Sequence, residues 1–116
     1  MYALIGILKK PPEMSVAEFR RWWLDEHAAQ ARLLPRLRRY DVFPLVSGFD
    51  SSTGRCDGAP SHDGVAFLWF DSKEDLEAAF ASAVGRKDIE HGTAVPIQYL
   101  LFCTDGGRQI PLPPAS

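Results

Sequence analysis

Four apolar segments alternate with polar or glycine-rich ones along the chain, and each predicts a β-strand. Residues 2–8 and 64–70 are continuously apolar, which is typical of strands buried on both faces. Residues 37–46 and 95–103 form the other two predicted strands. Pro44 lies inside residues 37–46. Because proline cannot donate a ladder hydrogen bond, its presence favours an edge position for that strand, or a bulge.

The first helix is predicted from a capping box that precedes a periodic apolar stripe. Ser15 is the expected cap, and Glu18, three residues later, is its expected partner in the box. The stripe recurs at helical spacing and contains Val16, Phe19 and Trp23. The next position of the stripe is His27, beside Glu26, so an ionisable pair stands where the pattern expects apolar residues. This helix is predicted from about residue 16 to His27 or a turn beyond.

The second helix is predicted after Ser72, which can cap it, with Asp75 in the capping-box position. Gly85 is expected to end this helix as a C-cap, and residues 86–92 are expected to add one short turn. The apolar stripe of the predicted helix consists of Leu76, Ala79, Phe80, Ala83 and Val84. Residues 47–62 are rich in Gly, Ser, Asp and Pro and predict a long loop between two strands.

The predicted order of elements is βαββαβ, which matches the ferredoxin-like arrangement of the α+β class, with one antiparallel four-stranded sheet. Two helices can cover only one face of such a sheet. Three of the strands are nevertheless apolar on both faces, and soluble monomers avoid large exposed apolar patches. The pattern therefore predicts a homodimer in which two sheets meet face to face. A cavity is expected between the sheet and the partner or the helix ends.

Composition and charge narrow the classes of partner. The 116 residues suit one domain, expected at residues 1–104, followed by an extended or disordered tail at residues 105–116. A net charge of −2 gives no electrostatic reason to expect nucleic acid or an anionic membrane. Cys56 and Cys103 lack metal-site spacing, and no signal peptide or membrane-spanning run is recognisable. A cytoplasmic protein with both thiols free, and with no metal or other cofactor, is expected.

Two motifs resemble a known family. The first comprises Phe19-x-x-Trp22-Trp23-x-x-x-His27-Ala28 followed by Leu34-Pro35-x-Leu37-x-x-Tyr40, and the second is Asp63-Gly64-Val65-Ala66-x-x-Trp69-Phe70-x-Ser72. Together they resemble the EthD family of the dimeric α/β-barrel superfamily. The run Glu90-His91-Gly92 is similar to that of methylmuconolactone methylisomerases, which are close relatives. The chain departs from the family pattern with Trp22 in place of Tyr and Arg36 in place of Gly.

The resemblance implies a ferredoxin-like fold, a β-barrel dimer, and small hydrophobic or aromatic-derived metabolites as substrates. Relatives of this kind include lactone isomerases, cofactor-free quinone-forming monooxygenases, and polyketide cyclases and dehydratases. Many members have no defined reaction. Together with the position of His27 on the apolar stripe, the resemblance favours a functional role for that histidine.

His27 is the first candidate catalytic residue, because a histidine can take and give a proton near neutral pH. Asp25 or Glu26 is its expected orienting partner; the alternative is an inert histidine near a helix C-terminus. His91 and Tyr40 are candidate assistants, although His91 can also simply end a helix. The candidate substrate-binding residues, for which core packing is the alternative, are Trp23, Trp69, Tyr99 and Phe67.

A small basic cluster is formed by Arg36, Arg38 and Arg39. We interpret this cluster as the solvated end of a strand; the alternative is an anion site that binds a substrate carboxylate.

Three functions compete at the level of sequence. The first is an isomerase- or cyclase-like enzyme that uses cofactor-free proton transfer on a small hydrophobic carbonyl compound or lactone, with His27 as acid or base. The second is a cofactor-free monooxygenase that activates an electron-rich polyphenol toward oxygen. The third is a non-catalytic small-molecule binder or structural dimer, which an apolar cavity with both His27 and His91 packed away would favour.

Overall fold

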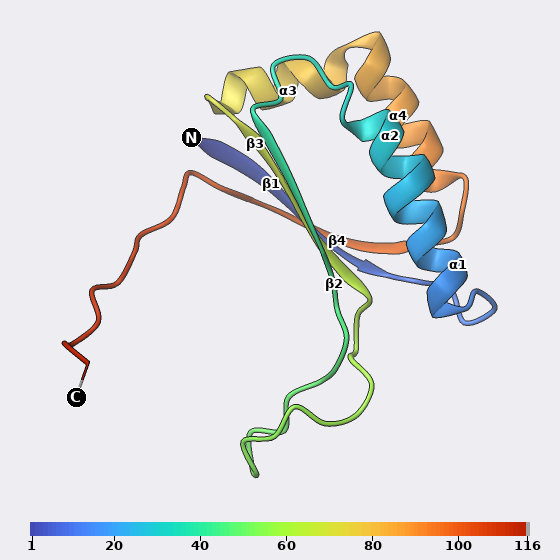
Figure 1. The fold of residues 1–116 in the computed structure, drawn as a ribbon. Helices are drawn as coiled ribbons and strands as arrows, with labels where there is room; N and C mark the ends of the chain where they lie inside the picture. The colour runs from blue at the N-terminus through green and yellow to red at the C-terminus, as the bar shows by residue number, and fades with distance from the viewer. Residues whose placement is uncertain (116) are drawn as a thin grey trace.

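A four-stranded antiparallel sheet forms one layer of the molecule, and the helices cover one of its faces (Figure 1). The computed structural model describes residues 1–115. The strands are β1 (Tyr2–Lys9), β2 (Arg39–Pro44), β3 (Gly64–Phe70) and β4 (Gln98–Thr104), in the order β2-β3-β1-β4. The predicted ferredoxin-like topology is therefore confirmed, and β2, which contains Pro44, lies at an edge as its proline requires.

The first helical segment is one continuous rod with three parts: α1 (Val16–Arg21), the π-helix η1 (Trp22–His27) and α2 (Ala28–Ala31). The predicted capping box is present, because the Ser15 Oγ accepts from the Glu18 amide at 3.0 Å. In return, the Ser15 amide donates to the Glu18 carboxylate at 3.3 Å. The π-helical segment is not part of the prediction, since apolar spacing alone does not distinguish a π turn from an α turn.

The second helical segment corrects the prediction of one helix with a C-cap at Gly85. Two helices are present, α3 (Lys73–Ala81) and α4 (Ala83–Thr93), and they meet at Ser82. The Ser82 hydroxyl donates to the Ala79 carbonyl at 2.6 Å and accepts from the Gly85 amide at 3.1 Å, so it bonds to both helices. Gly85 therefore belongs to the first turn of α4 rather than to a helix end.

Gly85 allows the close approach of these two helices. A Cβ atom at this position would lie 2.2 Å from the Ala79 carbonyl oxygen and 2.5 Å from the Phe80 Cα. Both of these atoms belong to the backbone of α3, so they cannot move aside as a side chain could. Glycine here sets the packing of α4 against α3, and thus the position of every side chain that α4 directs toward the sheet.

The core lies between the sheet and the first helical segment. Trp23, Phe19 and Phe70 are its largest fully buried side chains.

The loop after β2 and the tail after β4 extend away from the helices (Figure 1), and residues 105–115 contain no helix or strand. Ser116, at the end of the predicted tail, lies outside the described residues. None of the helices within residues 1–115 has the length and apolar character needed to cross a membrane.

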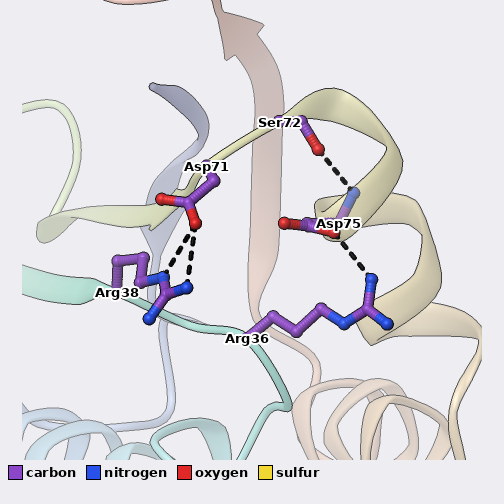
Figure 2. Close-up of polar contacts among 5 residues, drawn as sticks. All are labelled: Arg36, Arg38, Asp71, Ser72 and Asp75. Carbon is purple, nitrogen blue, oxygen red and sulfur yellow. Dashed lines mark hydrogen bonds and ion pairs between the residues drawn. The ribbon is translucent and has the colours of Figure 1, made fainter.

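The basic cluster is neutralised by the chain's own carboxylates. Its three ion pairs are Arg36–Asp75 at 2.7 Å, Arg38–Asp71 at 2.9 Å and Arg39–Asp41 at 2.7 Å. Figure 2 shows how two of them attach the segment just before β2 to Asp71, in the turn after β3, and to Asp75, in the first turn of α3, which Ser72 caps. With each cation already paired, the interpretation as a solvated strand end is favoured over a site for a substrate carboxylate.

Candidate functional site

A cavity of about 170 Å³ lies between the sheet and the helices. The sheet contributes mostly apolar side chains and a glycine to its wall: Leu4, Gly6, Leu8, Ala66, Leu68 and Leu101. The helices contribute Trp23, Ala31, Phe80, Ile89, Gly92 and Thr93. The polar and titratable groups that complete the wall are His27, Tyr40, Asp88 and Tyr99, which come from η1, β2, α4 and β4. The arrangement is an apolar pocket with a few convergent polar groups, as ligand sites usually are.

The π-helical turn positions His27. The amide of Ala28 donates to the Trp23 carbonyl five residues earlier, which is the π-helical bond. This wider turn brings residues five apart together, and the rings of Trp22 and His27 stack with centroids 5.1 Å apart and planes at 12°. His27 thereby lines the cavity with its side chain only 12 % exposed.

His91 from α4 forms a direct hydrogen bond with His27. Their Nδ1 atoms lie 2.9 Å apart, so one ring donates its N–H and the other accepts. Trp22 also stacks on His91, with ring centroids 5.6 Å apart. His91 is half-buried but does not line the cavity, whereas His27 does. The two histidines thus form a pair that joins η1 to α4, with His27 at the cavity wall and His91 behind it.

Asp88 is the functional candidate that sequence reasoning missed. Its side chain is buried at the cavity wall, and within residues 1–115 its Oδ1 has no hydrogen-bond partner. This oxygen lies 3.7 Å from Nε2 of His27, which is beyond direct hydrogen-bond distance. The expected orienting residues Asp25 and Glu26 are exposed instead. One feature of the sequence could have identified Asp88: it precedes His91 by three residues, so the two side chains lie on the same face of α4.

Burial shifts the pKa values of Asp88 and His27 in opposite directions. Desolvation raises the pKa of Asp88 to about 6, and the nearby positive charge of His91 partly offsets this. Desolvation, and then repulsion from His91, lowers the pKa of His27 to about 4. Near neutral pH, Asp88 is therefore mostly ionised and poised close to its pKa, while His27 is neutral.

Two tyrosine hydroxyls complete the polar part of the wall. The Tyr99 hydroxyl donates to the Gly92 carbonyl at 2.8 Å, so its proton is already used. The Tyr40 hydroxyl lines the same cavity and makes no hydrogen bond within the described part of the chain. Burial, followed by repulsion from Asp88, raises the pKa of each tyrosine to about 12. Both stay protonated, and Tyr40 is the free donor.

The predicted substrate-binding residues lie in two places. Trp23 and Tyr99 line the cavity, although Trp23 is also fully buried in the core. Phe67 and Trp69 alternate along β3 with the buried residues that face the helices, so they lie on the opposite face of the sheet. Their rings stack there with centroids 6.1 Å apart. In this chain these two aromatic residues are not part of the cavity.

The geometry supports acid–base chemistry. The cavity combines a carboxylate near its pKa, a neutral imidazole and a free hydroxyl donor, which are the groups that proton transfer at carbon or oxygen needs. Within residues 1–115, no group of three or more His, Cys, Asp or Glu side chains could hold a metal ion.

Comparisons with solved structures support the fold. An EthD family protein from Bacillus halodurans is 19% identical, with a TM-score of 0.73 over 92% of this chain and 99% of that chain. SnoaB, a cofactor-independent oxygenase from Streptomyces nogalater, is 11% identical, with a TM-score of 0.64 over 96% of this chain and 97% of that chain. A dimeric ferredoxin-like protein of unknown function from Thermobifida fusca is 10% identical, with a TM-score of 0.60 over 89% of this chain and 90% of that chain.

No curated protein sequence matches the chain significantly. The EthD domain, however, matches residues 11–94. That stretch contains the helix of His27, three of the four polar groups of the cavity, and both motifs that suggested the family. The chain belongs to the EthD domain family.

Proposed function

We propose that this protein is an enzyme that transfers a proton on a small hydrophobic carbonyl compound or lactone, in an isomerase- or cyclase-like reaction without a cofactor. The observation that carries the proposal is Asp88, a buried carboxylate whose Oδ1 has no partner within residues 1–115 and lies 3.7 Å from His27 Nε2 at the cavity wall. A buried polar atom is normally hydrogen-bonded, so an unpartnered one in a cavity is a candidate for contact with a ligand. Strongly perturbed pKa values in a cleft also favour a functional site.

In the proposed reaction, Asp88 is the base. Its carboxylate takes a proton from the carbon next to the substrate carbonyl, the C–H electron pair forms the enolate double bond, and the carbonyl oxygen takes the negative charge. The Tyr40 hydroxyl donates a hydrogen bond to that oxygen. Asp88 then returns the proton to another carbon of the conjugated system. This restores the carbonyl group and shifts a double bond without net oxidation.

His27 and His91 have supporting roles in this proposal. A neutral His27 can hydrogen-bond the substrate through Nε2, while its Nδ1 is held by His91 at 2.9 Å. Because His91 bonds His27 but lies outside the cavity wall, the pair provides a route by which a proton can leave the cavity. The sequence suggested His27 as the acid or base; the proposal gives the role of base to Asp88, which is ionised near neutral pH, and leaves His27 to hydrogen-bond the substrate.

Deuterium exchange tests the proposal without knowledge of the natural substrate. A panel of small cyclic ketones and unsaturated lactones is incubated with the protein in D₂O, and deuterium next to the carbonyl is followed by NMR. We expect exchange above background with some panel members, and a loss of ~10²–10⁴-fold in Asp88→Asn and in His27→Gln. Asp57→Asn, on the exposed loop, is the control and should keep full activity. Binding of panel members with no exchange at all would leave the non-catalytic binder as the leading function.

A second candidate is a cofactor-free monooxygenase. It is favoured by the fold likeness to SnoaB, which is described as a cofactor-independent oxygenase, and by a base at the wall of an apolar cavity. In this case Asp88 would remove the proton of a phenol hydroxyl, which makes the ring electron-rich enough to react with O₂. Oxygen uptake with a polyphenol separates the two candidates, because proton transfer alone consumes no oxygen.

We also propose that the protein is a homodimer, formed through the sheet face that the helices leave uncovered. Register places Ile5 of β1 between Phe67 of β3 and Phe102 of β4, so these three share that face. Phe43 of β2 packs edge-to-face on Phe67 and is 51% exposed, and Phe102 is 55% exposed. Soluble monomers rarely expose aromatic surface this extensive.

The two exposed free cysteines fit a reducing compartment, and we propose a cytoplasmic location.

A further inference from the structure

The cavity wall carries a negative charge that no lysine or arginine in the wall balances. Of the side chains that line it, Asp88 is the one that is ionised near neutral pH, and lysine and arginine are absent from the wall. His27 does not compensate, since burial keeps it neutral at that pH. The nearby cluster of Arg36, Arg38 and Arg39 is tied to other carboxylates.

We propose that this cavity selects small ligands that offer a hydrogen-bond donor and carry no negative charge, and that Asp88 is the residue that excludes carboxylates. The inference rests on the proposed function only in placing the ligand in the same cavity. It goes beyond that function because it assigns the charge of the ligand and names the residue that decides it.

The physical basis is the poor solvation of charge in an apolar cavity. A ligand carboxylate would lose its water and meet a like charge, with no lysine or arginine in the wall to offset either cost. A ligand hydroxyl would instead donate to Asp88 Oδ1, the buried acceptor that lacks a partner within residues 1–115. That oxygen and His27 Nε2 are 3.7 Å apart, so one ligand hydroxyl can contact both.

The size of the cavity restricts the ligand further. Its volume of about 170 Å³ lies below the ~300–1,000 Å³ of pockets that take drug-sized molecules, so it suits a compound with one ring. The exposed side chains of Ile89 and Leu101 lie at its wall, and they place its opening between α4 and β4. The apolar part of a ligand can therefore contact Leu101 while its hydroxyl reaches Asp88.

Three probes that share one ring and chain length test the inference: 3-phenylpropanol, 3-phenylpropanoate and 3-phenylpropylammonium. Affinities are measured by calorimetry at pH 8, where Asp88 is ionised. We expect the alcohol to bind at least tenfold more tightly than the carboxylate in the native protein. Asp88→Asn should reduce this ratio to near one, mainly by strengthening carboxylate binding. If Asp88→Asn does not fold, the affinities of the alcohol and the carboxylate for the native protein still test the inference.

Gly6→Val is the control that shows where the probes bind. Gly6 lines the cavity, and a Cβ there would meet Leu101 and Leu8 at ordinary contact distances of 3.6 and 3.7 Å, so a side chain can be added at this position. Valine suits a strand and is expected to occupy part of the cavity, so we expect it to abolish binding of the alcohol. Equal or tighter binding of the carboxylate would overturn the inference, whereas binding of the ammonium compound that is lost in Asp88→Asn would support the negative charge at Asp88. Binding of the alcohol that persists in Gly6→Val would also overturn the inference. Selective binding of the alcohol without any deuterium exchange would contradict the proposed function but not this inference.

Discussion

Asp88 and His27 contribute to stability with opposite dependence on pH. The folded pKa of His27 is lowered from 6.5 to about 4, so the unfolded chain holds the extra proton between these values and stability rises with pH. The folded pKa of Asp88 is raised from 3.8 to about 6, so the folded chain holds the extra proton and stability falls as pH rises through this window. The two contributions largely cancel in the native protein.

Single substitutions should reveal each contribution. His27→Gln lacks the His27 contribution, so its free energy of unfolding relative to the native protein should fall as pH rises from about 4 to about 6.5. Asp88→Asn lacks the Asp88 contribution, so the same difference should rise as pH rises from about 4 to about 6. Urea unfolding at several pH values measures both. Slopes of the same sign in the two variants would show that burial does not shift these pKa values in opposite directions.

At the scale of elements, the site depends on how α4 packs. Asp88, His91 and Gly92 all lie on α4, and they meet η1 and β4 only because α3 ends at Ser82 and α4 starts in a new direction. Gly92 contributes by its lack of a side chain, since a Cβ there would lie 3.2 Å from the Tyr99 hydroxyl and 3.3 Å from Cε1 of His27.

Gly85→Ala should disturb this packing. The added methyl group would collide with the backbone of α3 at 2.2 Å, so one helix must shift. We expect a loss of ~1–3 kcal/mol in the free energy of unfolding, as for other overpacked sites, together with weaker probe binding in the cavity. Gly107→Ala is the matched control: no atom lies within 4 Å of a Cβ there, so its effect should stay within ~0.5 kcal/mol. Equal stabilities of the two variants would contradict the proposed close approach.

At the scale of the whole molecule, the sheet has two apolar faces and the helices cover one. The covered face contains the cavity, and the uncovered face carries Phe43, Phe67 and Phe102. The loop after β2 and the C-terminal tail extend on the side away from the helices (Figure 1) and expose Phe49 and Leu112. The exposed aromatic side chains of the uncovered sheet face are the surface that the proposed homodimer would bury.

Phe102→Asp should convert the proposed dimer to a monomer. Phe102 is exposed in the single chain, so a charge there should spare the fold, but it would be buried without a partner in an interface between two sheets. Light scattering at micromolar concentration should give the dimer mass for the native protein and half that mass for the variant. Leu112→Asp on the tail, 86% exposed, is the control and should remain dimeric. A monodisperse native monomer would contradict the homodimer.

The sequence by itself determined the elements whose signals are local. The capping box of Ser15 and Glu18, the cap at Ser72 and the apolar runs of the strands each act within a few residues, so they predict two helix starts and the strands. The order of these elements predicts the topology, and two short motifs predict the family. His27, Tyr40 and Tyr99 were identified as candidates, and the structure brings all three to one cavity.

Only the tertiary structure decided the chemistry of the cavity. Asp88 is 61 positions from His27 in the sequence, and its carboxylate is buried beside that imidazole only because α4 packs against η1. The π turn and the break at Ser82 were not predicted either, because apolar periodicity distinguishes neither a π turn from an α turn nor a serine cap within a helical stretch. Packing also places Phe67 and Trp69 on the opposite face: alternation along β3 is visible in the sequence, but which face receives the helices is set by packing.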